Sequence, residues 1–175
     1  GSLEIIDDGQ EAILWPRTPA VPHTTLFRRK DGERINWFDH EFRYACSDAD
    51  FLARLGQSGS VVHVRSVVSY YRRGHAQIWA DDVRTTISQV QLWSKHLGTM
   101  TSSQGALARQ IRQRLLWALL KLDYYDKLGQ IDAAFSWANK RRDAVYLLSP
   151  VQRVKFIWRS TIHNNLRQFL NRDPK

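Results

Sequence analysis

The sequence predicts a mixed α/β domain followed by an α-helical C-terminal extension. Short runs rich in Val, Ile and Leu, bounded by Gly, Pro and Asp, mark the first hundred residues, whereas beyond residue 105 apolar residues recur every three or four positions. With 43% hydrophobic and 11% aromatic residues, the 175-residue chain is able to bury a core. The Gly-, Ser- and Thr-rich stretch 98–105 is the best linker. We therefore expect domains at 1–98 and 99–175.

The first region begins with short elements. Residues 3–6 are predicted to form a strand that ends in an Asp-Asp-Gly turn. Residues 11–15 form a second strand candidate closed by Pro16, and residues 23–29 a third, because their apolar residues weakly alternate. Residues 30–33, Lys-Asp-Gly-Glu, are expected to form a polar turn.

Longer elements follow. Residues 48–55 have helical spacing, since Phe51, Leu52 and Leu55 fall on one face. The valine-rich stretch 60–71 predicts one or two strands, and residues 80–97 return to a helical pattern.

The extension is predicted to contain three helices, at 107–128, 131–146 and 151–170, separated by Gly129 and Pro150. The first two form a plausible αα-hairpin.

Charge is divided unevenly along the chain. Residues 1–100 carry 12 Lys/Arg and 12 Asp/Glu, so the whole net charge of +9 belongs to residues 101–175. Such a surplus suits an anionic partner, either a membrane surface or a nucleic acid, although a merely solvated basic face has the same composition. No stretch reaches the ~20 apolar residues of a spanning helix. The single cysteine, Cys46, favours a reducing, cytoplasmic setting.

Four segments together resemble the acceptor side of bacterial family-2 glycosyltransferases, which have the GT-A fold. The main one is 36–55, NWFDHEFRYACSDADFLARL, which is similar to the segment leading into the helix that carries the family's catalytic carboxylate. Residues 59–75, ending in Tyr-Arg-Arg-Gly-His, are similar to the strand and loop that follow. Residues 22–29 and 3–9 are similar to the preceding strands, in the family's order.

The resemblance implies an inverting sugar transfer from a nucleotide-sugar donor to a glycan or lipid-linked acceptor, in bacterial surface glycan synthesis. It also implies a nucleotide-sugar-binding half ahead of this region, with a D-x-D motif for Mg²⁺ or Mn²⁺. The main D-x-D site is absent from this chain, because Asp48-Ala49-Asp50 falls at the catalytic-base position instead. We therefore expect the chain to need that N-terminal half of its own domain for activity.

Asp48 matches the family's catalytic base, a role that a carboxylate at a helix N-terminus suits, although a plain first-turn acid has the same spacing. Asp50 is interpreted as a first-turn acid or an acceptor contact. Arg54 is interpreted as a ligand of the carboxylate or the diphosphate, or as a surface arginine.

The resemblance further implies that the loop after residue 71 closes over the diphosphate. Arg72 and Arg73 would bind phosphate oxygens there, and His75 is either a metal ligand or an ordinary loop residue.

In the extension, aromatic and basic residues interleave, as in helices that lie on anionic membranes. We expect Arg141, Arg142, Arg153 and Lys155 to bind such a surface, holding the protein at the inner face of the bacterial membrane. The three tryptophans at 117, 137 and 158 are interpreted as core. The alternatives are a nucleic-acid-binding module and a helical protein-interaction module, but no nucleic-acid-binding signature is present.

Overall fold

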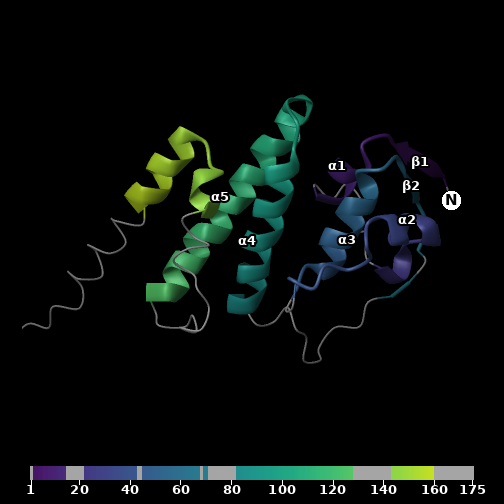
Figure 1. The fold of residues 1–175 in the computed structure, drawn as a ribbon, viewed down its shortest axis with the longest axis horizontal. Coiled ribbons are helices and arrows are strands. Elements are labelled where there is room, and N and C mark those ends of the chain that lie inside the picture. The colour runs from purple at the N-terminus through teal and green to yellow at the C-terminus, as the bar shows by residue number, and fades with distance from the viewer. Residues whose placement is uncertain are drawn as a thin grey trace, which may run out of the picture. The chain divides into compact units, whose positions relative to one another are not determined.

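The computed structural model describes residues 2–14, 22–42, 45–67, 69–70, 82–127 and 143–159. Two compact units are present, Gly1–Ser88 and Gln89–Lys175. Helices predominate, and the described residues form one two-stranded antiparallel sheet (Figure 1). The coarse prediction of a mixed α/β region with further helices is therefore confirmed. The predicted boundary at 98–99 coincides with the end of helix α4 (Asp82–Thr99), whereas the two units divide inside this helix.

The sheet consists of β1 (Leu3–Ile6) and β2 (Val61–Val64), both predicted from the sequence. In the antiparallel register Leu3 lies opposite Val64 and Ile5 opposite Val62. Opposed residues of an antiparallel pair share a face, and all four of these apolar side chains are exposed. One face of the sheet is thus apolar and open to solvent.

The other face of the sheet carries polar groups. Glu4 accepts a hydrogen bond from Arg65 at 2.7 Å, and His63 Nδ1 lies 3.7 Å from the same carboxylate oxygen. The Arg65 guanidinium lowers the pKa of the Glu4 carboxyl.

Helix α1 (Gly9–Leu14) packs against helix α3 (Ser47–Gly56) through glycines. A Cβ at Gly9 would lie 2.4 Å from the carbonyl oxygen of Gly59, and one at Gly56 would lie 2.4 Å from the carbonyl carbon of Gly9. The helix α3 confirms the helix predicted at 48–55. The strand predicted at 11–15 is wrong: the Asp8 carboxylate accepts a hydrogen bond from the Glu11 amide at 2.8 Å and caps a helix there.

The third predicted strand, 23–29, and the turn at 30–33 are also wrong. The structure has a 3-10 helix, η1 (Pro22–Thr24), and then helix α2 (Arg29–Arg34). Ion pairs of helical spacing, Arg29–Glu33 at 2.8 Å and Asp31–Arg34 at 3.1 Å, support α2.

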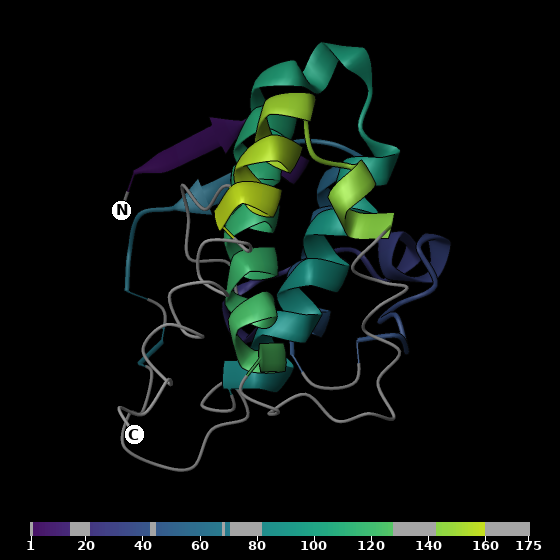
Figure 2. The same cartoon turned by 90° about the vertical axis from the view of Figure 1, so that its left-hand side faces the viewer.

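The second unit contains the end of α4, the 3-10 helix η3 (Ser102–Gln104) and helix α5 (Gly105–Lys127), with α4 and α5 side by side in both views (Figures 1 and 2). The helices predicted at 80–97 and 107–128 are confirmed. Residues 143–146 and 150–159 are helical, and the remainder of the predicted helices 131–146 and 151–170 lies outside the described residues.

Two capping boxes mark helix starts in this unit. Thr101 and Gln104 exchange side-chain and backbone hydrogen bonds at η3. Ser149 does the same with Gln152, because its hydroxyl accepts from the Gln152 amide at 3.4 Å and its own amide donates to the Gln152 side chain at 3.2 Å. Pro150 occupies the first helical position, where its missing N–H is harmless.

The core of the second unit is aliphatic. Its buried hydrophobic members from α4 and α5 are Val90, Leu92, Trp93, Leu97, Leu107, Ala108, Ile111, Leu115, Leu116, Ala118, Leu119 and Leu122. The interpretation of the tryptophans as core is wrong for Trp117 and Trp158, which are 53% and 62% exposed, while Trp137 lies outside the described residues. Within the part of the chain that is described, no helix combines the length and apolar character needed to cross a membrane.

Candidate functional site

The N-terminus of α3 displays the predicted acids. Asp48 and Asp50 both lie in its first turn, where negative charge is favoured by the helix dipole. The preceding residue, Cys46, has a left-handed backbone with φ 65°, and its carbonyl accepts the Asp50 amide at 2.9 Å. Because the two carboxylates are two positions apart on a helix, they point in directions about 200° apart and lie in different surroundings.

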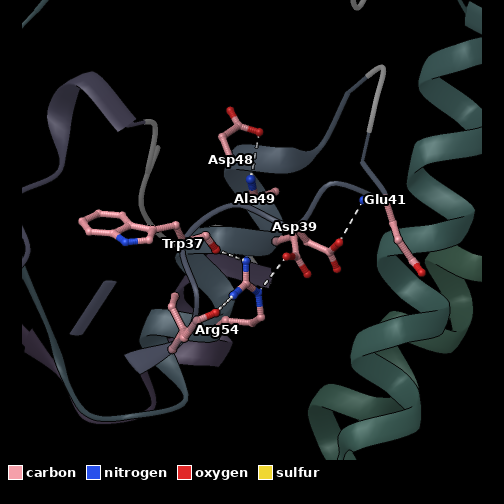
Figure 3. Close-up of polar contacts among 8 residues, drawn as sticks. Trp37, Asp39, Glu41, Asp48, Ala49 and Arg54 are labelled. Carbon is pink, nitrogen blue, oxygen red and sulfur yellow. Dashed lines mark hydrogen bonds and ion pairs between the residues drawn. The ribbon is translucent and has the colours of Figure 1, made fainter. Parts of the chain in front are cut away.

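Asp48 remains partly open to solvent. Its Oδ1 accepts a hydrogen bond from the adjacent Ala49 amide at 2.8 Å, and Figure 3 shows its carboxylate pointing away from the Arg54 guanidinium. A hydroxyl group of another molecule can therefore reach this carboxylate from the solvent.

Asp50 is enclosed instead. Its side chain is 0% exposed and pairs with Arg54 Nε at 2.8 Å, while the Arg54 side chain is only 15% exposed. The remaining guanidinium nitrogens donate to the carbonyl oxygens of Ile35 and Trp37, each at 2.5 Å (Figure 3). Asp50 and Arg54 therefore form a buried clamp on the chain at 35–37. We refer to these two side chains as the Asp50–Arg54 clamp.

The clamped segment has an unusual backbone. Asn36 and Trp37 are consecutive non-glycine residues in the left-handed region, with φ 57° and 52°. Such a conformation costs about 1–3 kcal/mol per residue and persists only where the surrounding structure enforces it. Asn tolerates this region, whereas a bulky residue such as Trp adopts it rarely. The carbonyl bonds from Arg54 flank this strained pair and hold it.

Beside the clamp lies an aromatic cluster. Phe27, Trp37 and Phe38 surround the buried ring of Phe51, with centroid distances of 5.1, 6.4 and 4.5 Å. The Trp37 and Phe38 rings are stacked on Phe51 with interplanar angles of 9° and 21°. We call these four side chains the aromatic cluster.

The cysteine at the start of α3 is chemically quiet. Burial, followed by the negative charge of Asp48, raises the pKa of the Cys46 thiol from 9.0 to about 12. The thiolate is therefore scarce at neutral pH, and Cys46 is a poor candidate for a nucleophile.

The other residues expected at a diphosphate or metal site cannot be placed. Arg72, Arg73 and His75 lie outside the described residues. The described ranges contain no group of three or more His, Cys, Asp or Glu side chains arranged to hold a metal ion.

Of the four expected membrane contacts, Arg141 and Arg142 also lie outside the described residues. Arg153 donates from Nε to the Leu148 carbonyl at 2.9 Å, also contacts the Tyr146 carbonyl, and covers the Tyr146 ring. This arginine fastens the turn before the helix at 150–159. Lys155 is exposed on that helix.

Trp37 and Phe38 lie within the segment that resembles the family, but the sequence assigned them no role. The Asp50–Arg54 clamp was not predicted either. Two adjacent aromatic residues in a polar stretch were the available signal, whereas the left-handed backbone left no mark in the sequence. Comparison of the chain with known protein families, characterised proteins and solved structures finds no match.

Proposed function

We propose that this chain is the acceptor-side part of an inverting glycosyltransferase of GT-A type, with Asp48 as the catalytic base. The observation that supports this most is the division of labour in the first turn of α3. Asp50 is buried in its pair with Arg54, whereas Asp48 keeps solvent access at the helix N-terminus. Of the two acids, only Asp48 has the access that a base acting on an incoming substrate needs.

The chemistry follows from that position. In an inverting transfer, the acceptor hydroxyl attacks the anomeric carbon of the donor, the bond to the nucleotide diphosphate breaks, and a base removes the hydroxyl proton. A carboxylate within hydrogen-bond reach of the hydroxyl is suited to this step.

The open sheet supports the proposal that a donor-binding half completes the domain. A two-stranded sheet is marginally stable alone, and exposed apolar patches mark surfaces that meet a partner. The apolar face formed by Leu3, Ile5, Val62 and Val64 provides such a surface. In the completed enzyme, Arg72 and Arg73 would bind the diphosphate, and a divalent metal with His75 as one ligand would neutralise the leaving group.

Asp50 and Arg54 would contribute to binding of acceptor or diphosphate indirectly. Their hydrogen bonds join α3 to the chain at 35–37, so their contribution to binding would run through the placement of that segment.

A cytoplasmic enzyme attached to the inner face of the membrane fits the exposed side of the helix at 150–159. Besides Lys155 it presents the apolar residues Val151, Val154, Ile157 and Trp158 to solvent. Basic and aromatic residues of this kind suit the headgroup region of anionic lipid. Cosedimentation with phosphatidylglycerol vesicles should weaken when Lys155 and Trp158 are replaced by Ala. Binding to nucleic acid with a steep salt dependence, and none to vesicles, would favour the alternative of a nucleic-acid-binding module.

The decisive assay measures sugar transfer by the protein that includes the donor-binding half, against a panel of nucleotide sugars. Asp48→Asn should lower turnover by at least about 100-fold, because it removes a general base, while leaving donor affinity nearly unchanged. Asp31→Asn is the matched control, since Asp31 is also a first-turn helix acid but forms only an exposed pair with Arg34. Equal turnover of Asp48→Asn and the parent enzyme would remove the assignment.

A further inference from the structure

Helix α5 exposes two aromatic rings and a cation on one side. Trp117 and Tyr124 are 53% and 45% exposed, and Lys121 between them is exposed as well. Because these residues are spaced at i, i+4 and i+7, they lie on the same side of the helix, over a length of about 10 Å. We call these three side chains the α5 stripe. Exposed rings gathered on one side of a helix mark a surface that meets a partner.

The α5 stripe is continuous with the helix at 150–159. The Arg159 guanidinium lies over the Trp117 ring, 5.4 Å from its centroid, and Arg112 Nε donates to the Leu147 carbonyl oxygen at 3.2 Å. These two contacts hold the short helix against α5, and the two helices are neighbours in both views (Figures 1 and 2). Arg159 therefore brings the exposed residues of the two helices together.

The charge at this surface suits an anionic partner. Residues 101–175 hold the whole net charge of +9. Among the α5 residues up to 125, the acidic one is Asp123, which is 3% exposed and so lies on the buried side of the helix. A guanidinium carries five N–H donors, so Arg159 can bind phosphate oxygens while it lies over the Trp117 ring.

Exposed aliphatic side chains favour a bilayer over a nucleic acid as this partner. Val151, Val154 and Ile157 of the adjoining helix are 77%, 68% and 59% exposed. Single-stranded nucleic acids stack their bases on aromatic rings, and aliphatic groups give them no such contact. A bilayer takes up aliphatic groups at the acyl boundary, tryptophan and tyrosine at headgroup level, and cations at the lipid phosphates.

We propose that the α5 stripe and the helix at 150–159 form one surface that binds an anionic bilayer, with Lys121 and Arg159 bound to lipid phosphates. This inference rests on the membrane attachment proposed above and extends it from one short helix to two helices. Membrane affinity grows with the buried apolar area and with the number of cations at the surface. The α5 stripe should therefore contribute to the affinity alongside the short helix.

The experiment is cosedimentation of the 175-residue chain with vesicles of mixed phosphatidylglycerol and phosphatidylcholine. Vesicles of phosphatidylcholine alone test the need for anionic lipid. A fluorescein-labelled oligothymidylate tests the binding of a nucleic acid. Circular dichroism checks that each variant keeps its helices.

Two of the three variants have matched controls in the first unit. Lys121→Gln removes a charge from the stripe, and Lys30→Gln is its control, because Lys30 is an exposed lysine of α2. Tyr124→Ala removes a ring, and its control is Tyr70→Ala, which removes another exposed tyrosine. Trp117→Ala removes the ring beneath Arg159. Lys121→Gln and Tyr124→Ala keep the test decisive if Trp117→Ala loses helix content.

On the anionic vesicles, we expect the partition coefficient to fall about 5-fold in Lys121→Gln and about 2- to 10-fold in Trp117→Ala and Tyr124→Ala. The two control variants should change it by less than about 2-fold, and vesicles of phosphatidylcholine alone should bind the parent more weakly. Equal vesicle binding by the parent and the three α5 variants, or none by the parent, would overturn the proposal. Oligothymidylate binding that depends on Trp117 and Tyr124, beside vesicle binding that does not, would also overturn it.

Two further results separate this inference from the proposals above. Vesicle binding that is lost on replacing Lys155 and Trp158 by Ala, but kept in the α5 variants, would refute the stripe and leave the short helix as the attachment. Vesicle binding that depends on the stripe, together with equal turnover of Asp48→Asn and the parent in the completed enzyme, would refute the base and keep the lipid-binding surface.

Discussion

The unit at residues 1–88 and the unit at residues 89–175 are stabilised by different kinds of contact. The first depends on a buried ion pair, two glycines in close backbone contact and stacked aromatic rings. The second depends on aliphatic side chains of α4 and α5 packed at high burial. Aliphatic packing is tolerant of which atoms supply it, whereas the contacts of the first unit are specific. The difference predicts that apolar substitutions of similar volume are tolerated in the second core but not at these contacts of the first unit.

The largest effect should come from opening the Asp50–Arg54 clamp. Arg54→Met removes the guanidinium that pairs with the buried Asp50 carboxylate and binds the Ile35 and Trp37 carbonyls, so we expect the free energy of unfolding to fall by about 3–5 kcal/mol. Hydrogen exchange measured by peptide should rise in α3 and in residues 35–37, with little change in α5.

Arg29→Met is the control for that variant. The Arg29–Glu33 pair has the same i,i+4 spacing and the same 2.8 Å distance, but its side chains are exposed. We expect the free energy of unfolding to change by no more than about 0.5 kcal/mol. Similar exchange in the two variants would show that burial does not distinguish the pairs.

In the second unit, removal of apolar atoms alone should lower the free energy of unfolding by a comparable amount. Leu119 is fully buried in α5, so Leu119→Ala should destabilise by about 2–5 kcal/mol, whereas Leu119→Met should cost less than about 1.5 kcal/mol. Denaturation followed by circular dichroism measures both. A loss from Leu119→Met as large as that from Leu119→Ala would contradict the tolerance ascribed to this core.

The contact between Gly9 and Gly56 in the first unit predicts a smaller change in stability. Gly56→Ala places a methyl group 2.4 Å from the Gly9 backbone, and we expect it to destabilise by about 1–3 kcal/mol although alanine favours helix. Gly98→Ala is the control, because nothing lies within 4 Å of a Cβ there, and it should stabilise by up to about 1 kcal/mol. Thermal unfolding distinguishes the two, and changes of the same sign would be contrary to the account.

The smallest effect on stability is expected at alkaline pH and comes from the Cys46 thiol. The folded-state pKa of Cys46 is raised to about 12 from 9.0, so its contribution to stability is complete below pH 9 and is lost as the pH rises toward 12. Between pH 9 and pH 10 the free energy of unfolding lost through this thiol is about 1 kcal/mol. Cys46→Ser does not titrate there, so the stability difference between parent and variant should shrink between pH 9 and pH 10. A constant difference would refute the shifted pKa.

Sequence patterns predicted the longest helices and both strands. Helices α4 and α5 followed from apolar spacing, and β1 and β2 followed from short β-branched runs beside turn residues. The strand predicted at 11–15 failed because one capping side chain, Asp8, decides between helix and strand in so short a segment.

For the candidate site, the sequence singled out Asp48, Asp50 and Arg54 and gave them different roles, but it did not predict that Asp50 pairs with Arg54. Burial distinguishes the clamp from the open acid, and Arg54, the partner of Asp50, also binds carbonyls of a segment whose Asn36 and Trp37 have left-handed backbones. No residue in that segment is glycine, so the usual signal for positive φ was lacking.

The claim that α3 uses one acid for structure and leaves the other for chemistry is tested most directly by denaturing Asp48→Asn and Asp50→Asn side by side. The account predicts that Asp48→Asn changes the free energy of unfolding by less than about 1 kcal/mol. It predicts that Asp50→Asn lowers the same quantity by at least about 2 kcal/mol, because the Arg54 guanidinium loses its buried counter-charge. Equal losses, or a larger loss from Asp48→Asn, would contradict it.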